Sequence, residues 1–315
     1  MDLDRTLGGF RILHPFTDED DKTWHTGNAH AIYAHREFVR ECDPSHVLVL
    51  SADHVYTLDY RDVLDAHLDT GAEVTVVTTE VEGDVSRYGV VQTAGHRITR
   101  FEYKPEEPQG HVVATEIFLY DTNVLLDSLE AIVADVGEDE LSDFGEQLLP
   151  RLVERGKVLA FPLSGYWRDL GTIESYWQGH ADLLGTDPKL DLDDPDWPIL
   201  GQLQQRPAAR VLEGARVIDS VLGSGTVIRG TVIRSVVGPG SVIDAGAEVA
   251  DSVLMDDVVI GPEASVRFAV LGDDTRVERG ATVGEGGPAG GITVVSGGST
   301  VEEGSAVSGQ EDGAS

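Results

Sequence analysis

A short repeat in the last third of the chain limits its possible folds more than any other feature. Segments 219–222, 234–237, 251–254 and 268–271 read DSVL, RSVV, DSVL and FAVL, at offsets of 15, 17 and 17 residues. An apolar anchor follows each of them, at Val227, Val242, Val258 and Val277. This period suits a coil of three short strands that point aliphatic side chains inward, with Gly or Asp at corners where positive φ costs little. Because the segment is rich in glycine and β-branched residues, a helical repeat is excluded, and we expect residues 210–307 to form a parallel β-helix.

The first part of the chain alternates strand-like and helix-like segments. Residues 46–50 (HVLVL) are continuously apolar, which predicts a buried parallel strand. Residues 61–70 (RDVLDAHLDT) have apolar side chains at helical spacing and predict a helix that stops at Gly71. Residues 73–79 (EVTVVTT) predict another strand, and residues 146–153 (EQLLPRLV) are amphipathic. This alternation predicts βαβ units and a mainly parallel sheet.

Changes in composition mark the boundaries between these parts. Residues 187–198 (DPKLDLDDPDWP) are rich in Asp and Pro and predict a surface linker. The last eight residues are polar and are predicted to be disordered. The predicted organisation is an α/β domain over 1–180, a linker over 181–209, the β-helix over 210–307 and a tail over 308–315.

Charge and cysteine content exclude several classes of protein. The formal net charge of −33 repels nucleic acid phosphates, so no nucleic-acid partner is expected, and it favours a solubilising surface. No stretch approaches the ~18 apolar residues of a membrane span. The beginning of the sequence lacks the basic and apolar regions of a signal peptide, and the single cysteine, Cys42, cannot form an internal disulfide. Together these features predict a cytoplasmic protein.

Two carboxylates are candidate metal ligands. Asp53 lies just past the apolar strand, where ligands bind open parallel sheets, and Asp169 precedes Gly171 and a helix expected near Glu174. Together they could hold Mg²⁺, a hard cation that prefers carboxylate and phosphate oxygens. The alternative is that Asp53 caps the following turn or helix. Beside Asp169, aromatic residues such as Trp167 are more often core residues than ligand contacts.

Two further segments are candidate anion sites. Lys104 in FEYKP could bind a phosphate as a point charge, although a solvated turn lysine is the more common explanation. Gly27, Asn28 and Ala29 precede a helix-like run whose first backbone amides could hold an anion or a base edge. A DFG tripeptide at 143–145 is not accompanied by a kinase catalytic loop or a Gly-rich ATP loop, so a kinase is excluded.

Taken in order, these segments resemble the bacterial glucose-1-phosphate adenylyltransferases (ADP-glucose pyrophosphorylases). The matching segments are WHTGNAHAIY (24–33), SADHVY (51–56), YGVV (88–91), FEYKP (101–105), SDFGEQLLP (142–150), GYWRDLGTIESYW (165–177) and DWPI (196–199). The resemblance implies a Rossmann-like α/β nucleotidyltransferase domain followed by a left-handed parallel β-helix. It also implies a reaction of ATP with glucose 1-phosphate that gives ADP-glucose and pyrophosphate for storage-glucan synthesis, in a homo-tetramer or in a hetero-oligomer.

The resemblance also assigns roles to residues. It implies that Asp53 and Asp169 are the catalytic ligands of Mg²⁺ and that Lys104 binds the sugar phosphate. His25, Gly89, Tyr103, Thr115 and Glu116 would complete the substrate site, and Gly27, Asn28 and Ala29 would lie near the nucleotide. The transfer itself depends on positioning and charge neutralisation.

The chain departs from the family pattern at several positions. Asn28 and His30 replace Thr and Asp, Tyr103 replaces a Glu that would contact sugar hydroxyls, and ATEIF (114–118) replaces a Ser-Met-Gly run. The altered pocket leaves the sugar and base specificity open. Members of the family also begin with a strand and a Gly-rich, Arg-containing loop that holds the triphosphate. LGGF (7–10) does not replace that loop, and we expect the family's first strand to lie upstream of Met1.

Two other functions would fit parts of this sequence. The absent loop and Tyr103 would also suit a non-catalytic or regulatory subunit that binds sugar phosphate. The β-helix resembles hexapeptide-repeat acyltransferases, but those enzymes generally use a catalytic histidine near a coil, and no histidine follows His180. The nucleotidyltransferase is therefore the preferred function.

Overall fold

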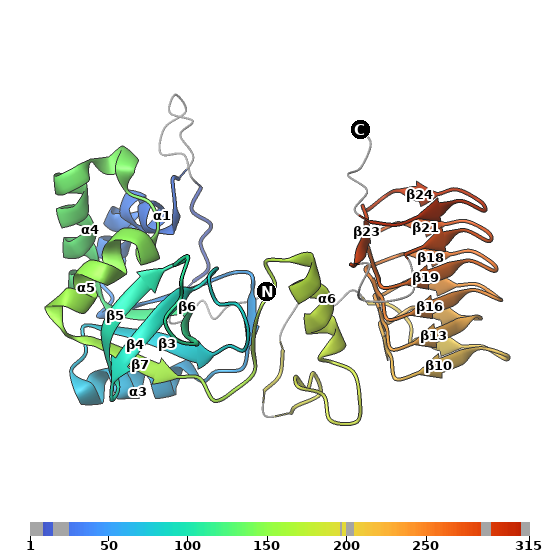
Figure 1. Cartoon of the computed structure of the whole chain (residues 1–315), viewed down its shortest axis with the longest axis horizontal. Coiled ribbons are helices and arrows are strands. Elements are labelled where there is room, and N and C mark those ends of the chain that lie inside the picture. Colours follow the sequence, from blue (N-terminus) through green and yellow to red (C-terminus); the bar gives the residue numbers. More distant parts are fainter. Residues whose placement is uncertain (1–8, 15–24, 196, 200–204, 285–290, 310–315) are drawn as a thin grey trace. The chain divides into compact units, whose positions relative to one another are not determined.

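The computed structural model describes residues 9–14, 25–195, 197–199, 205–284 and 291–309. They divide into two compact units, the first ending at Trp167 and the second beginning at Arg168 (Figure 1). Trp24 of the WHTGNAHAIY segment, Leu7 and Gly8 of LGGF, and residues 310–315 of the predicted tail lie outside the described residues. Helix α6 (Ile173–Ala181) belongs to the second unit, together with the β-helix.

The first unit is built on a mixed sheet with strand order β1–β6–β3–β7–β5–β4. These strands are β1 (His46–Leu50), β3 (Val74–Glu80), β4 (Gly89–Ala94), β5 (Arg97–Tyr103), β6 (Val112–Asp121) and β7 (Val158–Pro162). Within the described sheet, β3 and β7 form the parallel pair, and β6 lies antiparallel between β1 and β3. The prediction of a mainly parallel sheet was wrong because β6 separates β1 from β3, although both run in the same direction.

Strand β1 is only partly buried, contrary to the prediction from its apolar run. Its residues are half-buried or exposed because it lies at an edge of the described sheet, and Leu50 is exposed. A continuous apolar run therefore identified the strand but not its depth in the fold.

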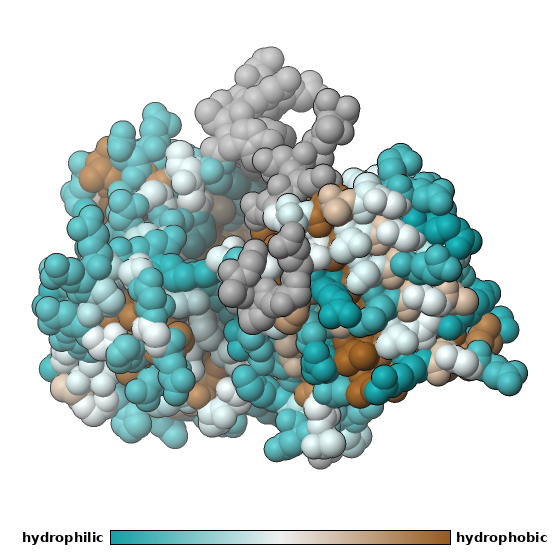
Figure 2. Space-filling model, turned by 45° about the vertical axis from the view of Figure 1, so that its right-hand side comes forward, coloured by the Kyte–Doolittle hydropathy of each residue, from teal (hydrophilic) through white to brown (hydrophobic). Residues whose placement is uncertain are grey.

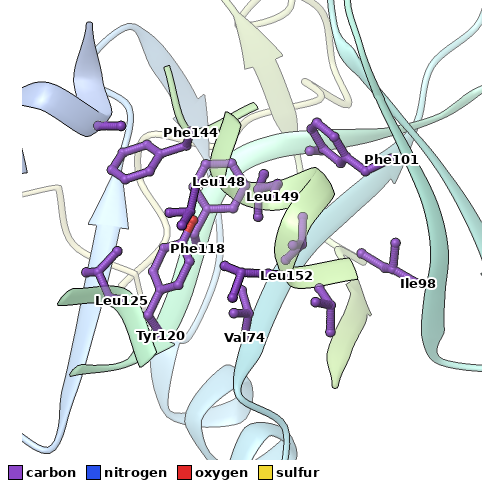
Figure 3. Packing of buried hydrophobic residues seen from close by; sticks show 14 of the residues in the cluster. Val74, Ile98, Phe101, Phe118, Tyr120, Leu125, Phe144, Leu148, Leu149 and Leu152 are labelled. Carbon is purple, nitrogen blue, oxygen red and sulfur yellow. The ribbon is translucent and has the colours of Figure 1, made fainter. Parts of the chain in front are cut away.

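Helices and short elements complete the first unit. They are α1 (Asn28–Ala34), α2 (Arg36–Cys42), β2 (His54–Tyr56), α3 (Tyr60–Thr70), α4 (Thr122–Val136), a 3₁₀ turn (Glu138–Glu140), a π-helical turn (Phe144–Leu148), α5 (Leu149–Arg155) and β8 (Trp167–Asp169), which continues into the second unit. Helix α3 is confirmed: Asp59 caps its first turn, and Gly71 at φ 60° ends it. In the core, Leu125, Phe144, Leu148 and Leu152 pack around Tyr120, and all are almost fully buried (Figure 3). This packing fixes the segment 142–149 against the sheet.

The second unit contains a parallel β-helix with three sheets. The first consists of β10 (Arg216–Ile218), β13 (Thr231–Ile233), β16 (Glu248–Ala250), β19 (Ser265–Arg267), β22 (Thr282–Val283) and β25 (Ala306–Val307). The second consists of β11 (Val221–Leu222), β14 (Val236–Val237), β17 (Val253–Leu254), β20 (Ala269–Leu271) and β23 (Thr293–Val295). The third consists of β9 (Arg210–Val211), β12 (Val227–Ile228), β15 (Val242–Ile243), β18 (Val259–Ile260), β21 (Arg276–Val277) and β24 (Thr300–Val301).

The predicted repeat register is confirmed at the SVL positions. Val221 aligns with Val236, Val236 with Val253, and Val253 with Val270. The residues before these strands, Asp219, Arg234, Asp251 and Phe268, all adopt φ between 42° and 49° at a corner. The predicted anchors Val227, Val242, Val258 and Val277 were wrong as a single row. The buried row is Ile228, Ile243, Ile260 and Val277, which keeps the same offsets of 15, 17 and 17 residues, whereas Val227 and Val242 precede it in their strands and are only half-buried.

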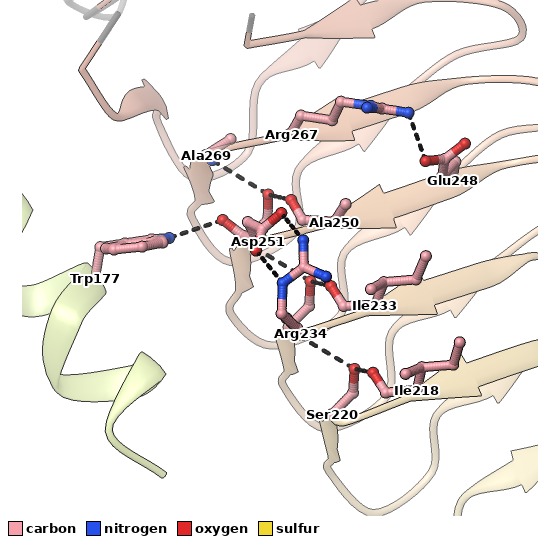
Figure 4. Close-up of polar contacts among 12 residues, drawn as sticks. Trp177, Ile218, Ser220, Ile233, Arg234, Glu248, Ala250, Asp251, Arg267 and Ala269 are labelled. Carbon is pink, nitrogen blue, oxygen red and sulfur yellow. Dashed lines mark hydrogen bonds and ion pairs between the residues drawn. The ribbon is translucent and has the colours of Figure 1, made fainter. Parts of the chain in front are cut away.

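A ladder of side chains also joins successive coils. The Ser235 and Ser252 backbone amides donate to the hydroxyls of Ser220 and Ser235, and Ala269 N donates to Ser252 Oγ at 3.2 Å (Figure 4). Helix α6 is attached to this ladder, since Trp177 Nε1 donates to the Asp251 carbonyl at 2.8 Å. The predicted linker, 187–198, has no helix or strand in its described residues.

The face of the molecule drawn in Figure 2 is largely hydrophilic, as the net charge of −33 leads one to expect. In the part of the chain that the structure describes, the helices are too short or too polar to cross a membrane.

Candidate functional site

A small pocket of the first unit brings together several predicted site residues. Its lining consists of Asn28, Gly89, Phe101, Tyr103, Ala114, Glu116, Phe118, Phe144 and Gly145, around an open volume of about 20 Å³. Gly89 and Tyr103 face each other as register partners on β4 and β5. Three predicted substrate residues and one predicted nucleotide residue therefore share one concave surface.

A bulge in β6 places Glu116 in this pocket. Between the pairs Val76–Phe118 and Thr78–Ala114, strand β3 has one residue and β6 has three. Within this insertion, Glu116 adopts φ 56°, which a side-chain-bearing residue adopts only at a cost of about 1–3 kcal/mol. Such bulges redirect a side chain, and strained residues of this kind cluster at binding sites.

Asp143 connects the two sides of the pocket. Tyr103 donates its hydroxyl hydrogen to Asp143 Oδ2 at 2.8 Å, and the Asn28 amide donates to Asp143 Oδ1 at 3.2 Å. Asn28 Oδ1 in turn accepts the Phe144 amide at 2.8 Å. The close approach requires Gly145, because a Cβ there would lie 2.2 Å from the Tyr103 ring.

The start of α1 is committed to protein contacts rather than to an anion. The amides of Ala29 and His30 donate to the Ser142 carbonyl, at 3.0 and 3.4 Å, and the Asn28 amide is held by Asp143. Gly27 permits this contact, since a Cβ there would meet the Ser142 oxygen at 2.4 Å. The predicted use of these amides to hold an anion is therefore not supported by the geometry.

Lys104 stands at the mouth of the pocket with its side chain exposed. Its ammonium lies 4.7 Å from the centre of the Tyr103 ring, and hydrogen bonding to the Tyr103 side chain raises the pKa of Lys104. The residue adopts φ 46°, a second strained position beside Glu116. A fixed cation next to a carboxylate and a phenol suits a sugar phosphate.

Asp53 lies in the turn between β1 and β2. The Ser51 hydroxyl donates to its carboxylate and is the main reason that the pKa of Asp53 is lowered. The carboxylate is therefore ionised at neutral pH, and its side chain is 61% exposed. Next to it, buried His54 bonds the Thr115 carbonyl through Nδ1 at 2.8 Å and contacts the Trp167 ring. Asp53 therefore offers an exposed carboxylate that a cation can reach, and the buried His54 supports the turn that carries it.

Asp169 belongs to the second unit, where it is buried. Its Oδ1 accepts the Gly171 amide at 2.6 Å, and its carbonyl accepts the Ser175 hydroxyl. These bonds fix the segment that enters α6, which Thr172 caps. Arg168 is not a free surface residue, since it pairs with the buried Asp182 at 2.7 Å.

Two other predicted substrate residues lie outside the pocket lining. The Thr115 hydroxyl is fully buried and donates to the Val77 carbonyl at 2.9 Å, so it supports the bulge. His25 packs edge-to-face against His30 and His35, and burial followed by these two neighbours lowers its pKa.

Asp143 and Trp167 were not among the predicted site residues. Asp143 lies in the matching segment SDFGEQLLP, so its position in a motif was the available signal. Trp167 Nε1 is buried without a hydrogen-bond partner while its ring contacts His54 and Tyr88. Such an unpaired donor becomes apparent only in the folded structure.

Comparison with known protein families agrees with this architecture. Residues 10–186 match the family model described as nucleotidyl transferase, and residues 207–289 match the GlmU-like C-terminal hexapeptide model. The fold and the site thus define a nucleotidyltransferase with a hexapeptide-repeat β-helix, a class of enzymes that generally use a divalent metal ion.

Individual relatives indicate the family within this class of nucleotidyltransferases. The glucose-1-phosphate adenylyltransferase of Bacillus cereus (strain Q1) is 36% identical over 286 residues, which cover 90% of this chain and 75% of the relative. That of Desulforamulus reducens is 37% identical over 291 residues, covering 90% of this chain and 71% of the relative. The chain belongs to the glucose-1-phosphate adenylyltransferase family.

Proposed function

We propose that this protein transfers an adenylyl group from ATP to glucose 1-phosphate, with formation of ADP-glucose and pyrophosphate. The observation that carries the proposal is the convergence of Gly89, Tyr103 and Glu116 on one pocket with Lys104 at its mouth. Relatives named for this activity, at 36–37% identity, support it. The non-catalytic subunit is not favoured, since those relatives are named as enzymes.

The pocket residues would bind and orient the sugar phosphate. The Lys104 ammonium pairs with the phosphate, and Glu116 accepts hydrogen bonds from sugar hydroxyls. The Tyr103 hydroxyl, held by Asp143, limits the depth of the pocket. This positioning directs a phosphate oxygen at the α-phosphorus of ATP.

Asp53 and Asp169 would hold the divalent metal, which we propose to be Mg²⁺. The donor set fits, because both groups offer carboxylate oxygens and the pKa of Asp53 is lowered. When bound, the ion would neutralise charge on the phosphates.

Release of pyrophosphate from ATP and glucose 1-phosphate tests the proposal. With Mg²⁺ present, Asp53→Asn should lower kcat at least ~100-fold, whereas Asp65→Asn, on the exposed side of α3, should leave it unchanged. Lys104→Gln should weaken glucose 1-phosphate binding, measured by calorimetry, at least ~10-fold. Near-normal rates in Asp53→Asn would refute the metal assignment, and unchanged sugar phosphate affinity in Lys104→Gln would refute the pocket.

The cellular location and the oligomeric state of the enzyme are also proposals. We propose a cytoplasmic protein, a location that suits the single exposed Cys42. We also propose a homo-oligomer, or a subunit of a hetero-oligomer, for which light scattering of the purified chain is the test.

A further inference from the structure

A second cluster of ligand-type side chains lies in the first unit, at the opposite end of β1 from Asp53. His46 is the first residue of β1 and pairs in register with Asp121, the last residue of β6. His67 reaches them from α3 and is almost fully buried. One nitrogen or oxygen atom from each of the three side chains lies within 4.8 Å of the others.

The distances in this cluster lie at the long limit of hydrogen bonds and also suit a shared cation. The Nε2 atoms of His46 and His67 lie 3.3 and 3.4 Å from the same oxygen, Asp121 Oδ1. A charged N–H···O bond would be about 2.7–2.9 Å long. Two ligands about 2.05 Å from a tetrahedral zinc ion are separated by roughly 3.3 Å. The two imidazole–carboxylate separations therefore match two edges of such a coordination polyhedron.

The outer nitrogen of each imidazole is held by a hydroxyl. His67 Nδ1 lies 2.9 Å from Thr75 Oγ1, and His46 Nδ1 lies 2.9 Å from Ser45 Oγ. Partners of this kind fix the ring orientation of metal-binding histidines and aim Nε2 at the metal. Both rings therefore direct the same type of atom at one point.

The Asp121 side chain also does not cap the helix that follows it. It occupies the N-cap position of α4, where an aspartate side chain ordinarily accepts a backbone amide and stabilises the helix. Here its side chain makes no capping bond, and Oδ1 faces the two histidines. The Asp121 carboxylate thus faces the two histidines and leaves the first turn of α4 without a side-chain cap.

We propose that His46, His67 and Asp121 form a binding site for a zinc-class divalent ion, separate from the Mg²⁺ site proposed for catalysis. Two imidazoles and one carboxylate suit a borderline ion, and His46 and Asp121, 21% and 39% exposed, leave a fourth position to water. The ion would connect the start of β1 to the end of β6 and to α3. Because β1 is a half-buried edge strand, such a link would stabilise it.

Metal analysis of the untagged, full chain tests this site. After exhaustive dialysis, mass spectrometry of the metals should find about one zinc per chain. Adding Zn²⁺ to chelator-treated protein at ~100 times its dissociation constant should raise Tm by about 5–10 °C. Co²⁺ should give the intense visible absorption of a tetrahedral site, a signal that Mg²⁺ in the catalytic site does not produce.

Variants decide where the ion binds. His67→Gln and the more exposed His46→Gln should each weaken Zn²⁺ binding at least ~100-fold, whereas His111→Gln, at an exposed histidine elsewhere, should keep it. His46→Gln keeps the test valid should His67→Gln fail to fold. A chain without zinc and without a Tm response to Zn²⁺ would overturn the proposal and leave a hydrogen-bonded His–Asp–His cluster. Zinc retained by both variants would also overturn it. Neither result depends on adenylyl transfer.

Discussion

Replacing Tyr103 by Phe removes one oxygen atom from the proposed sugar pocket. That oxygen donates to Asp143 Oδ2 at 2.8 Å, and Asp143 also holds the amide of Asn28. Burial raises the pKa of Tyr103, so the phenol remains a donor throughout the neutral range. The ring itself stays between Gly145 and Lys104, so the substitution tests the hydrogen bonds of the hydroxyl, to Asp143 and to Lys104, rather than the packing.

The size of the effect follows from the chemistry of this bond. A hydrogen bond to a charged group contributes about 1.5–3 kcal/mol, and half-buried partners that water can reach contribute less, about 1 kcal/mol here. For a unit of this size, that loss lowers Tm by about 2–4 °C. The same free energy corresponds to a KM for glucose 1-phosphate that is about 5-fold higher. The kcat should change by less than ~2-fold, because the hydroxyl orients the pocket and does not touch the phosphorus.

A double-mutant cycle measures the bond. Tyr103→Phe, Asp143→Asn and the double variant should show a coupling of about 1 kcal/mol in the free energy of unfolding. Tyr60→Phe, which removes an exposed hydroxyl bonded to Tyr56 at 2.9 Å, is the matched control and should cost less than ~0.5 kcal/mol. A coupling below ~0.3 kcal/mol, together with an unchanged KM, would refute the connection between Tyr103 and Asp143.

Three further predictions concern packing and protonation. Gly145→Ala would place a Cβ 2.2 Å from the Tyr103 ring, so unfolding should become easier by about 1–3 kcal/mol and KM should rise, whereas Gly9→Ala, with open space around it, should do neither. Ile243→Ala, in the fully buried row of the β-helix, should cost about 2–5 kcal/mol in chemical denaturation, and its outward neighbour Val242→Ala should cost much less; equal losses would contradict the register. The pKa of His25 is lowered in the folded state, so its contribution to stability is present above the unfolded value of 6.5 and is lost as pH falls below it. His25→Gln should therefore flatten the fall of Tm between neutral and acidic pH, and an unchanged slope would argue against a half-buried neutral imidazole at this position.

Local signals in the sequence were sufficient to predict the β-helix. The spacing of Val221, Val236 and Val253 predicted that these residues stack, because each coil repeats the same local contacts and the register follows from the period alone. The anchor row was placed one residue early at Val227 and Val242 and two early at Val258, because adjacent Val and Ile residues left open which of them belongs to the buried row. Helix α3 was predicted from equally local signals, which are the helical spacing of its apolar residues and Gly71 at its end.

The identification of the candidate site depended on both the sequence motifs and the tertiary structure. Motif resemblance selected Gly89, Tyr103 and Glu116 one at a time, but their convergence depends on the pairing of β4 with β5 and on the bulge in β6. The inward-facing Glu116 could not be predicted, because a bulge is decided by the partner strand and not by the strand that contains it. The same pairing buried the Thr115 hydroxyl.

Tertiary structure alone decided the sheet and the second cluster. An apolar run such as HVLVL indicates that a strand forms but does not indicate which strands pair with it. The insertion of β6 between β1 and β3 could therefore not be predicted from the sequence. That insertion places His46 beside Asp121, and the packing of α3 adds His67, which is 54 positions away from Asp121 in the chain. The repeat predicted a fold because its contacts recur at a fixed short period. Contacts between distant segments have no period, and they exist only once the chain has folded.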